Sequence, residues 1–198
     1  MYFYHFTTSA NIASIRRFGL NIGVTPFSQM TGHKAVSLTT VPNPERLGLL
    51  KGETLTEGYD DGFDHMEKCY PQLIVTNSNG LKEIKLFDQT ESLLKIDLNI
   101  ASSKLLNYND FFEKEIIKGL YPKKSNDLYE IIKAVGIHSA DYPYSTKHLP
   151  KEVIDSEVEE IVKGRRKHNA GNWYFYFGVI KPANILQIQT RQQNGSYA

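Results

Sequence analysis

A histidine and a threonine near the start of the chain carry side chains that can bind a planar amide and a phosphate. They stand in Tyr4-His5-Phe6-Thr7, inside an aromatic and β-branched stretch that predicts a strand over residues 2–8. An imidazole can donate a ring proton to an amide, a threonine hydroxyl can donate and accept, and the helix start expected next favours anions. These residue types therefore favour a ligand that contains both a carboxamide and a phosphate. The alternative is a packed histidine beside a capping threonine.

Two more hydroxyls stand in Val36-Ser37-Leu38-Thr39-Thr40, in a strand predicted over residues 35–40. Side chains alternate between the two faces of a strand, so Ser37 and Thr39 are expected on one side. Arg46 follows soon after, and its guanidinium can bind a pyrophosphate through two parallel hydrogen bonds. This segment is expected to complete the ligand site.

The elements that must position these residues predict an α+β fold. Ser9 is expected to cap a helix over residues 10–18, which Gly19 ends. Asn77-Ser78-Asn79-Gly80 predicts a hairpin, and residues 51–71 read as an irregular insertion. Further helices are expected over residues 109–118, 125–135 and 152–163, and further strands over residues 73–76, 83–87, 93–98, 173–180 and 184–189. Strands and helices do not alternate regularly, so a parallel doubly wound sheet is not expected.

Three motifs in this order resemble the ADP-ribosyltransferase superfamily in its His-bearing branch. They are the Tyr-His-x-Thr strand, the helix Asn11-Ile12-x-x-Ile15-x-x-Phe18-Gly19-Leu20, and the later Ser-Leu-Thr-Thr strand. The ending from Trp173 to Ile185 is similar to the closing strands of such domains. The resemblance implies a single domain over residues 1–198, built as a split antiparallel β-sandwich with flanking helices.

The same resemblance implies that NAD is the substrate. His5 and Thr7 would then anchor its nicotinamide-ribose end, and Ser37 and Thr39 would line the nicotinamide pocket. By the chemistry of the guanidinium, the preferred candidate to hold the pyrophosphate is Arg46, with Arg16 and Arg17 as alternatives.

The family places a catalytic glutamate on a late strand, but Trp173 and Tyr174 occupy that place in this chain. The nearest acids lie in the run from Glu152 to Glu160. The candidates for the catalytic carboxylate are Glu157, Glu159 and Glu160. The alternative is that this run forms an exposed acidic helix.

A basic cluster precedes the aromatic strand that begins at Trp173. Its members expected to bind nucleic acid are Lys163, Arg165, Arg166 and Lys167. Cations beside stackable rings are typical of single-stranded nucleic-acid sites. The alternative is a solvated loop that leads into a core strand.

Composition narrows the classes of protein. The chain has 198 residues and a net charge of +1, which excludes binding of nucleic acid by bulk charge alone. No apolar run is long enough to span a membrane, no signal peptide is expected, and a single cysteine excludes an internal disulfide. A cytoplasmic protein without a membrane partner is therefore expected. The acids around Asp60 fit no metal-binding motif, so no metal is expected.

Together these features predict an NAD-dependent mono-ADP-ribosyltransferase. The predicted enzyme resembles DarT- and CmdT-type toxins, which modify RNA or DNA bases. Such an activity implies an antitoxin protein as partner. The alternatives are a protein-directed ADP-ribosyltransferase and a non-catalytic module that binds NAD or another nucleotide. A 2′-phosphotransferase would need more basic residues than this chain has.

Overall fold

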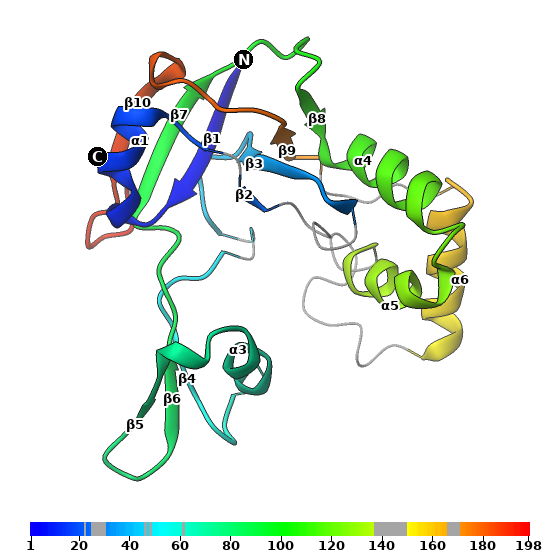
Figure 1. Ribbon diagram of the computed structural model, residues 1–198, viewed down its shortest axis with the longest axis horizontal. Helices are drawn as coiled ribbons and strands as arrows, with labels where there is room; N and C mark the ends of the chain where they lie inside the picture. Colours follow the sequence, from blue (N-terminus) through cyan, green and yellow to red (C-terminus); the bar gives the residue numbers. More distant parts are fainter. Residues whose placement is uncertain are drawn as a thin grey trace. The chain divides into compact units, whose positions relative to one another are not determined.

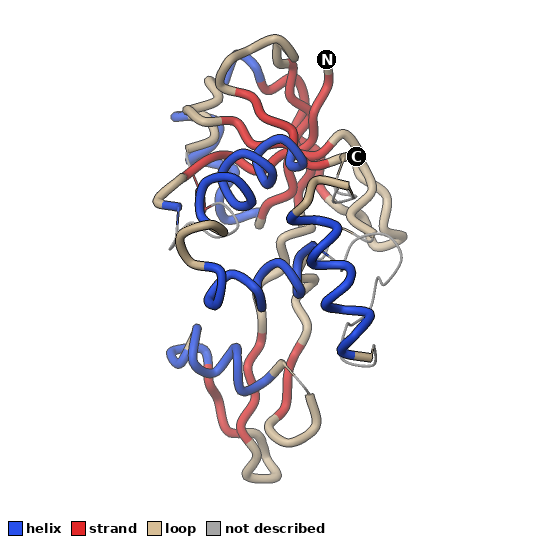
Figure 2. The backbone as a smooth tube through the Cα atoms, turned by 90° about the vertical axis from the view of Figure 1, so that its right-hand side faces the viewer, coloured by secondary structure: helices blue, strands red, loops and turns tan. Residues whose placement is uncertain are grey.

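The computed structural model describes residues 1–21, 23–24, 31–45, 47, 49–60, 62–136, 150–165 and 171–198. The chain forms two compact units. Unit 1 holds Met1, Leu20–Thr40 and Leu98–Ile180, and unit 2 holds Tyr2–Gly19, Val41–Asp97 and Lys181–Ala198. Figure 1 colours the chain along its sequence, and Figure 2 colours helices blue and strands red. The single domain expected over residues 1–198 stays a prediction.

Unit 2 contains three adjacent antiparallel strands. β1 (Tyr2–Thr7) pairs with β7 (Ser92–Asp97), and β7 pairs on its other edge with β10 (Ile185–Thr190). Thr7 stands directly across from Ser92, and both side chains are buried. Aromatic and β-branched residues suit such a pleated, half-buried surface, which explains why the aromatic segment of β1 forms a strand.

A short helical segment follows β1. It consists of the 3₁₀ turn η1 (Ser9–Asn11) and the helix α1 (Ile12–Phe18), which ends at Gly19 with a φ of 81°. The sequence prediction of Ser9 as a capping side chain is wrong. The carboxylate of Glu91 accepts the Ser9 N–H at 2.7 Å, and the Ser9 hydroxyl lies 3.4 Å from that of Ser92 instead.

The middle of unit 2 forms a second, three-stranded antiparallel sheet in the order β4-β6-β5. The hairpin around Gly80 is confirmed, because Thr76 stands across from Lys82 and Gly80 has a φ of 77°. The irregular insertion expected over residues 51–71 is wrong, since this segment forms a strand and a helix around the buried Phe63. Its elements are β4 (Thr54–Thr56), α3 (Phe63–Cys69), η2 (Pro71–Leu73), β5 (Ile74–Thr76) and β6 (Lys82–Lys85). Pairing with β6, distant along the chain, stabilises β4, and local periodicity cannot reveal it.

Unit 1 packs helices around one hydrophobic core. Its strands β2 (Gly23–Val24), β3 (Lys34–Thr39), β9 (Trp173–Tyr176) and β8 (Leu105–Asn107) pair in that order, all antiparallel. Its helices are α4 (Tyr108–Phe111), the π-helical η3 (Phe112–Leu120), α5 (Ser125–Gly136) and α6 (Lys151–Val162). Phe111, Ile116, Leu128 and Phe175 are among the residues buried in this core.

The strand pairings described above are antiparallel, and together with the helices they confirm the coarse prediction of an α+β fold. The short 3₁₀ turn η5 (Pro182–Asn184) connects into β10. Within the described ranges, every helix is too short or too polar to cross a membrane.

Candidate functional site

The end of β1 presents two of the residues expected to bind NAD. His5 and Thr7 lie on one face of β1, because side chains alternate along a strand. Thr7 is only 7% exposed, and its hydroxyl accepts a hydrogen bond of 3.0 Å from the Asn11 side-chain amide. The hydroxyl is therefore held in one orientation at the point where β1 leads into η1.

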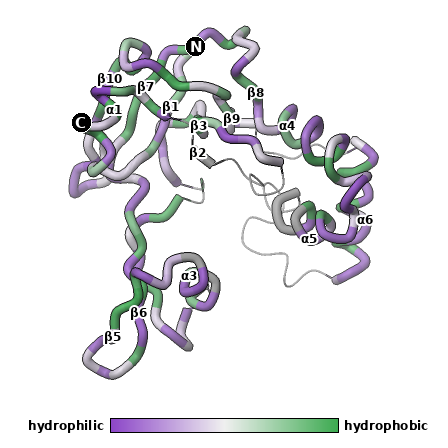
Figure 3. The backbone as a smooth tube through the Cα atoms, in the orientation of Figure 1, coloured by the Kyte–Doolittle hydropathy of each residue, from purple (hydrophilic) through white to green (hydrophobic). Residues whose placement is uncertain are grey.

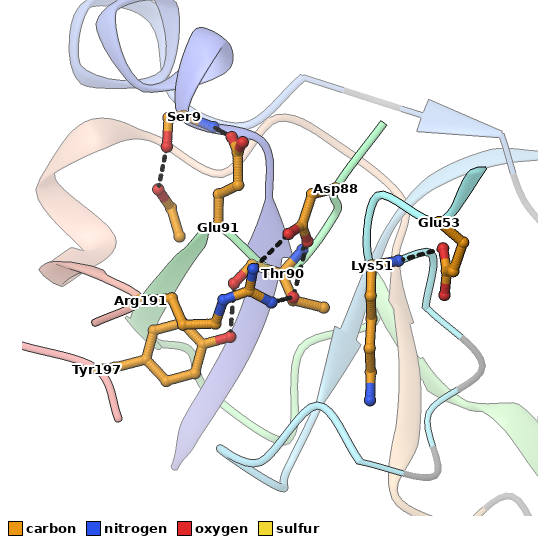
Figure 4. Close-up of polar contacts among 9 residues, drawn as sticks. Ser9, Lys51, Glu53, Asp88, Thr90, Glu91, Arg191 and Tyr197 are labelled. Atoms are coloured by element: carbon orange, nitrogen blue, oxygen red, sulfur yellow. Dashed lines mark hydrogen bonds and ion pairs between the residues drawn. The ribbon is translucent and has the colours of Figure 1, made fainter. Parts of the chain in front are cut away.

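A carboxylate lies beside this strand end. Glu91 immediately precedes β7 and turns its side chain toward the first residue of η1, where the Ser9 N–H donates to it at 2.7 Å (Figure 4). The Ser9 and Ser92 hydroxyls lie next to this contact. Hydroxyls, an amide and a carboxylate therefore converge where β1 ends and β7 begins. Such a set can hydrogen-bond a ribose, and its negative charge can stabilise a cation.

A polar network supports the loop that carries Glu91. The Arg191 guanidinium donates to the Asp88 carboxylate at 2.5 Å and to the Thr90 hydroxyl, and Thr90 donates to Asp88 at 2.8 Å (Figure 4). The Tyr197 hydroxyl donates to the Thr90 carbonyl at 2.7 Å, and the Arg191 N–H donates to the Glu91 carbonyl at 2.8 Å. The loop before β7 is thus tied to the C-terminal end of the chain.

The charges in this network are balanced. Burial alone would raise the pKa of Asp88, but hydrogen bonds from Thr90 and the neighbouring Arg191 guanidinium outweigh it and lower that pKa below its ordinary value. Burial raises the pKa of the Tyr197 phenol. Asp88 is therefore an ionised carboxylate that holds the Arg191 guanidinium. The Tyr197 hydroxyl stays protonated and donates a hydrogen bond to the Thr90 carbonyl.

Sequence reasoning missed Glu91 and the network behind it. Asp88-Gln89-Thr90-Glu91 lies between two predicted strands and carries no motif, and Arg191 lies close to the end of the chain. The available signal was an acid a few residues before the strand predicted over residues 93–98, but the sequence did not predict that this strand pairs with the one that carries His5. The pairing partner itself was not predictable from local pattern.

The second expected pair lies in unit 1. Ser37 and Thr39 are on β3, across from Phe175 and Trp173 of β9. Thr39 is buried and Ser37 is partly buried. Their expected place in a nicotinamide pocket stays a prediction, and Arg46 lies outside the described residues.

The three candidate glutamates lie on the helix α6 and not on a strand, so the alternative of an acidic helix holds for Glu157, Glu159 and Glu160. Helix α6 buries Ile154, Val158 and Ile161, and most of its other residues are hydrophilic (Figure 3). The Lys163 ammonium donates to Glu159 and lowers the pKa of that carboxyl.

The acids of α6 are paired with the cations expected to bind nucleic acid. Lys163 contacts Glu159, and Arg165 lies 2.5 Å from Glu160. Arg166 and Lys167 lie outside the described residues. The aromatic side chains of β9 contribute to the core, where Phe175 is 1% exposed and Trp173 packs against it. The charges of Lys163 and Arg165 are thus partly neutralised by ion pairs. The Phe175 ring of β9 is buried in the core and cannot stack on a base.

Unit 1 also contains a histidine–carboxylate pair that the sequence did not single out. His33 Nε2 lies 3.0 Å from Glu115 Oε2, and the imidazole packs edgewise against Phe111 and Phe177. Burial would raise the pKa of Glu115, but the hydrogen bond and charge of His33, together with Lys114, lower it. Glu115 lies in η3, and π-helical turns frequently mark functional sites.

Within the described ranges, no three histidine, cysteine or acidic side chains are grouped so that they would hold a metal ion. Comparison of the chain with protein-family models, with curated proteins and with solved structures gives no significant match.

Proposed function

We propose that the protein is an NAD-dependent mono-ADP-ribosyltransferase whose acceptor is a nucleic acid. One observation carries the proposal: β1 places His5 and Thr7 on one face, and the Asn11 side chain holds the buried Thr7 hydroxyl at 3.0 Å. A fixed hydroxyl next to an imidazole suits recognition of the nicotinamide-ribose end of NAD. The split sandwich architecture is part of the proposal.

Glu91 is our preferred candidate for the carboxylate of the reaction. Its side chain lies at the end of β1, where the Ser9 N–H donates to it, whereas two of the three α6 glutamates are occupied by Lys163 and Arg165. In the proposed reaction the bond between C1′ of the ribose and the nicotinamide nitrogen breaks, and nicotinamide leaves as a neutral molecule. A nucleophile on the acceptor then forms a bond to C1′ and gives up its proton.

A carboxylate accelerates this step only if it stabilises the transition state more than bound NAD. The ribose gains positive charge as nicotinamide leaves, so a fixed negative charge near C1′ meets that condition. Most of the remaining catalysis would come from holding the two reactants in position. The proposal needs no covalent intermediate with the protein.

The choice of acceptor follows from the resemblance. Lys163 and Arg165 are partly neutralised by their ion pairs, so the preference for RNA or DNA over protein rests on the resemblance to nucleic-acid-modifying toxins. A toxin of this kind would act in the cytoplasm and would need an antitoxin partner.

The test is incubation with NAD labelled on its adenylate, in separate pools of DNA, RNA and protein. We expect label in one nucleic-acid pool. His5→Ala should abolish the transfer while the circular dichroism spectrum stays unchanged. Thr7→Val should lower the affinity for NAD. The separate variant Thr7→Ser keeps the hydroxyl and should retain the wild-type affinity.

Glu91→Gln should reduce the rate of transfer strongly and leave NAD affinity nearly unchanged. Glu53→Gln is the matched control, because Glu53 also lies in unit 2 and also accepts a backbone N–H, from Lys51 at 2.8 Å. Glu157, Glu159 and Glu160 are changed to glutamine in the same series. An inactive variant among these three, together with an active Glu91→Gln, would return the catalytic role to α6. NAD binding without transfer to any pool would favour the non-catalytic binding module.

A further inference from the structure

β1 has a second face, on which two tyrosines lie beside a lysine. Because side chains alternate along a strand, Tyr2 and Tyr4 point away from the face that carries His5. Lys95 of β7 stands directly across from Tyr4, and Gln187 of β10 stands across from Lys95. Tyr2, Tyr4, Lys95 and Gln187 therefore share one face of β1, β7 and β10, which we name the tyrosine face.

The tyrosine face is open to solvent at Tyr2. The Tyr2 side chain is 51% exposed, Gln187 is exposed, and Tyr4 and Lys95 are partly exposed. The Lys95 ammonium lies 4.2 Å from the centroid of the Tyr2 ring, in a cation–π contact. Flat aromatic surfaces and a cation thus stand together on an accessible part of the sheet.

The segment η1 lies on the other side of β1. Its contacts reach Thr7 and Ser92, which both belong to the face opposite the tyrosines. One end of the tyrosine face is closed by the ring of Tyr197, which packs on Phe6 at 5.8 Å between centroids. The open end is the one that carries Tyr2.

We propose that the tyrosine face binds single-stranded nucleic acid. Tyr2 and Tyr4 are two residues apart on one strand, so their Cα atoms are separated by roughly 7 Å. This is about twice the 3.4 Å separation of stacked bases, so each ring can take a base from an unstacked strand. Stacking on aromatic side chains is the sequence-tolerant way in which proteins hold such strands.

The polar side chains of the face complete this arrangement. Lys95 offers one contact to a phosphate, and the Gln187 amide can donate and accept at a base edge. Asp97 is exposed and stands across from Tyr2, where its carboxylate repels a phosphate. A bound strand is therefore expected to run with its phosphates on the Lys95 side, away from Asp97.

This inference goes beyond the proposed transfer reaction. The tyrosine face and the His5 face are opposite sides of β1, and stacking of bases needs no NAD. The two proposals can therefore fail separately: His5→Ala should leave binding at the tyrosine face unchanged.

The experiment measures the fluorescence anisotropy of labelled oligothymidylate and oligouridylate of twelve nucleotides, without NAD. Tyr2→Ala and Tyr4→Ala should each weaken binding about fivefold or more, and Tyr2→Phe and Tyr4→Phe should keep it, because phenylalanine also stacks. Tyr59→Ala is the matched control, since Tyr59 is 79% exposed in the same unit but lies in a turn after β4. Its affinity should equal that of the wild type.

Charge variants test whether the phosphates of the bound nucleic acid lie on the Lys95 side of the tyrosine face. Lys95→Gln should weaken binding and reduce the slope of log affinity against log salt by about 0.7. Asp97→Asn should strengthen binding. If Tyr4→Ala fails to fold, Tyr2→Ala, Tyr2→Phe and the two charge variants still decide the matter.

Three results would overturn the proposal. The first is that the wild type binds neither oligonucleotide. The second is that Tyr2→Ala binds as tightly as Tyr59→Ala. The third is that a duplex of the same length binds more tightly than the single strands. A peptide or protein partner on this face would give the first result.

Discussion

Replacing Thr90 with valine removes one hydroxyl from a fully buried position and keeps the shape of the side chain. Thr90 is 0% exposed, and its hydroxyl donates to Asp88 at 2.8 Å while it accepts from Arg191. A hydrogen bond to a charged group contributes about 1.5–3 kcal/mol to stability. Arg191 is 32% exposed, so water can replace part of its lost contact, whereas Asp88 is only 13% exposed. We therefore expect Thr90→Val to lower the free energy of unfolding by about 2–4 kcal/mol.

The assay is urea unfolding followed by far-UV circular dichroism at pH 7. The only tryptophan, Trp173, lies in unit 1, so its fluorescence alone would not report on the unit that contains Thr90. Thr76→Val is the matched control, because Thr76 is exposed on β5 of the same unit, and such surface substitutions usually change stability by less than about 0.5 kcal/mol.

The effect of Thr90→Val should also depend on pH. The pKa of Asp88 is lowered in the folded protein, so its carboxylate contributes stability above its unfolded pKa, near 3.9, and this contribution is lost as the pH falls through the folded pKa. Thr90→Val removes the hydroxyl hydrogen bond that helps to lower the pKa of Asp88. The difference in stability between wild type and variant should therefore be largest near neutral pH and shrink below about pH 4. A loss no larger than that of the Thr76 control, at any pH, would refute the view that this hydroxyl anchors the loop before β7.

Three further predictions concern other parts of the chain. Phe175→Ala should destabilise the protein by about 3–5 kcal/mol in urea unfolding, because Phe175 is 1% exposed and its ring lies 5.0 Å from that of Phe111; a loss below 1 kcal/mol would mean that the core is not packed as described. Gly80→Ala should lower the free energy of unfolding by about 1–2 kcal/mol, and with it the melting temperature, because Gly80 has a φ of 77° that disfavours a side chain. An unchanged melting temperature would contradict the left-handed turn. Glu115→Gln should flatten the loss of stability on acidification in urea unfolding, because the pKa of Glu115 is lowered beside His33 and its contribution disappears as the pH falls through that pKa; a variant that loses stability as steeply as the wild type would contradict this pairing.

Several elements of the fold follow from neighbours along the chain. The strand at Tyr2–Thr7, the helix end at Gly19 and the hairpin turn at Gly80 each depend on residues within a few positions, where alternation and the backbone freedom of glycine act directly. The acidic run ending at Glu160 was also readable as a helix, because its apolar residues recur at helical spacing on one side. The sequence alone thus determined that this is an α+β chain and that His5 and Thr7 share one face of a strand.

Tertiary structure decided which groups stand around that strand. Glu91 meets Ser9 across 82 residues, and Arg191 meets Thr90 across 101, so no local pattern contains either contact. The same holds for β4, which pairs with a strand that begins at Lys82, and for the tyrosine face, where Lys95 is brought beside Tyr4 only by the register of β7 on β1. Spacing along the sequence predicts which side of an element a residue occupies, because that depends on backbone geometry alone. It does not predict the partner on the next element, because that is chosen by the burial of apolar surface and the pairing of polar groups over the whole chain.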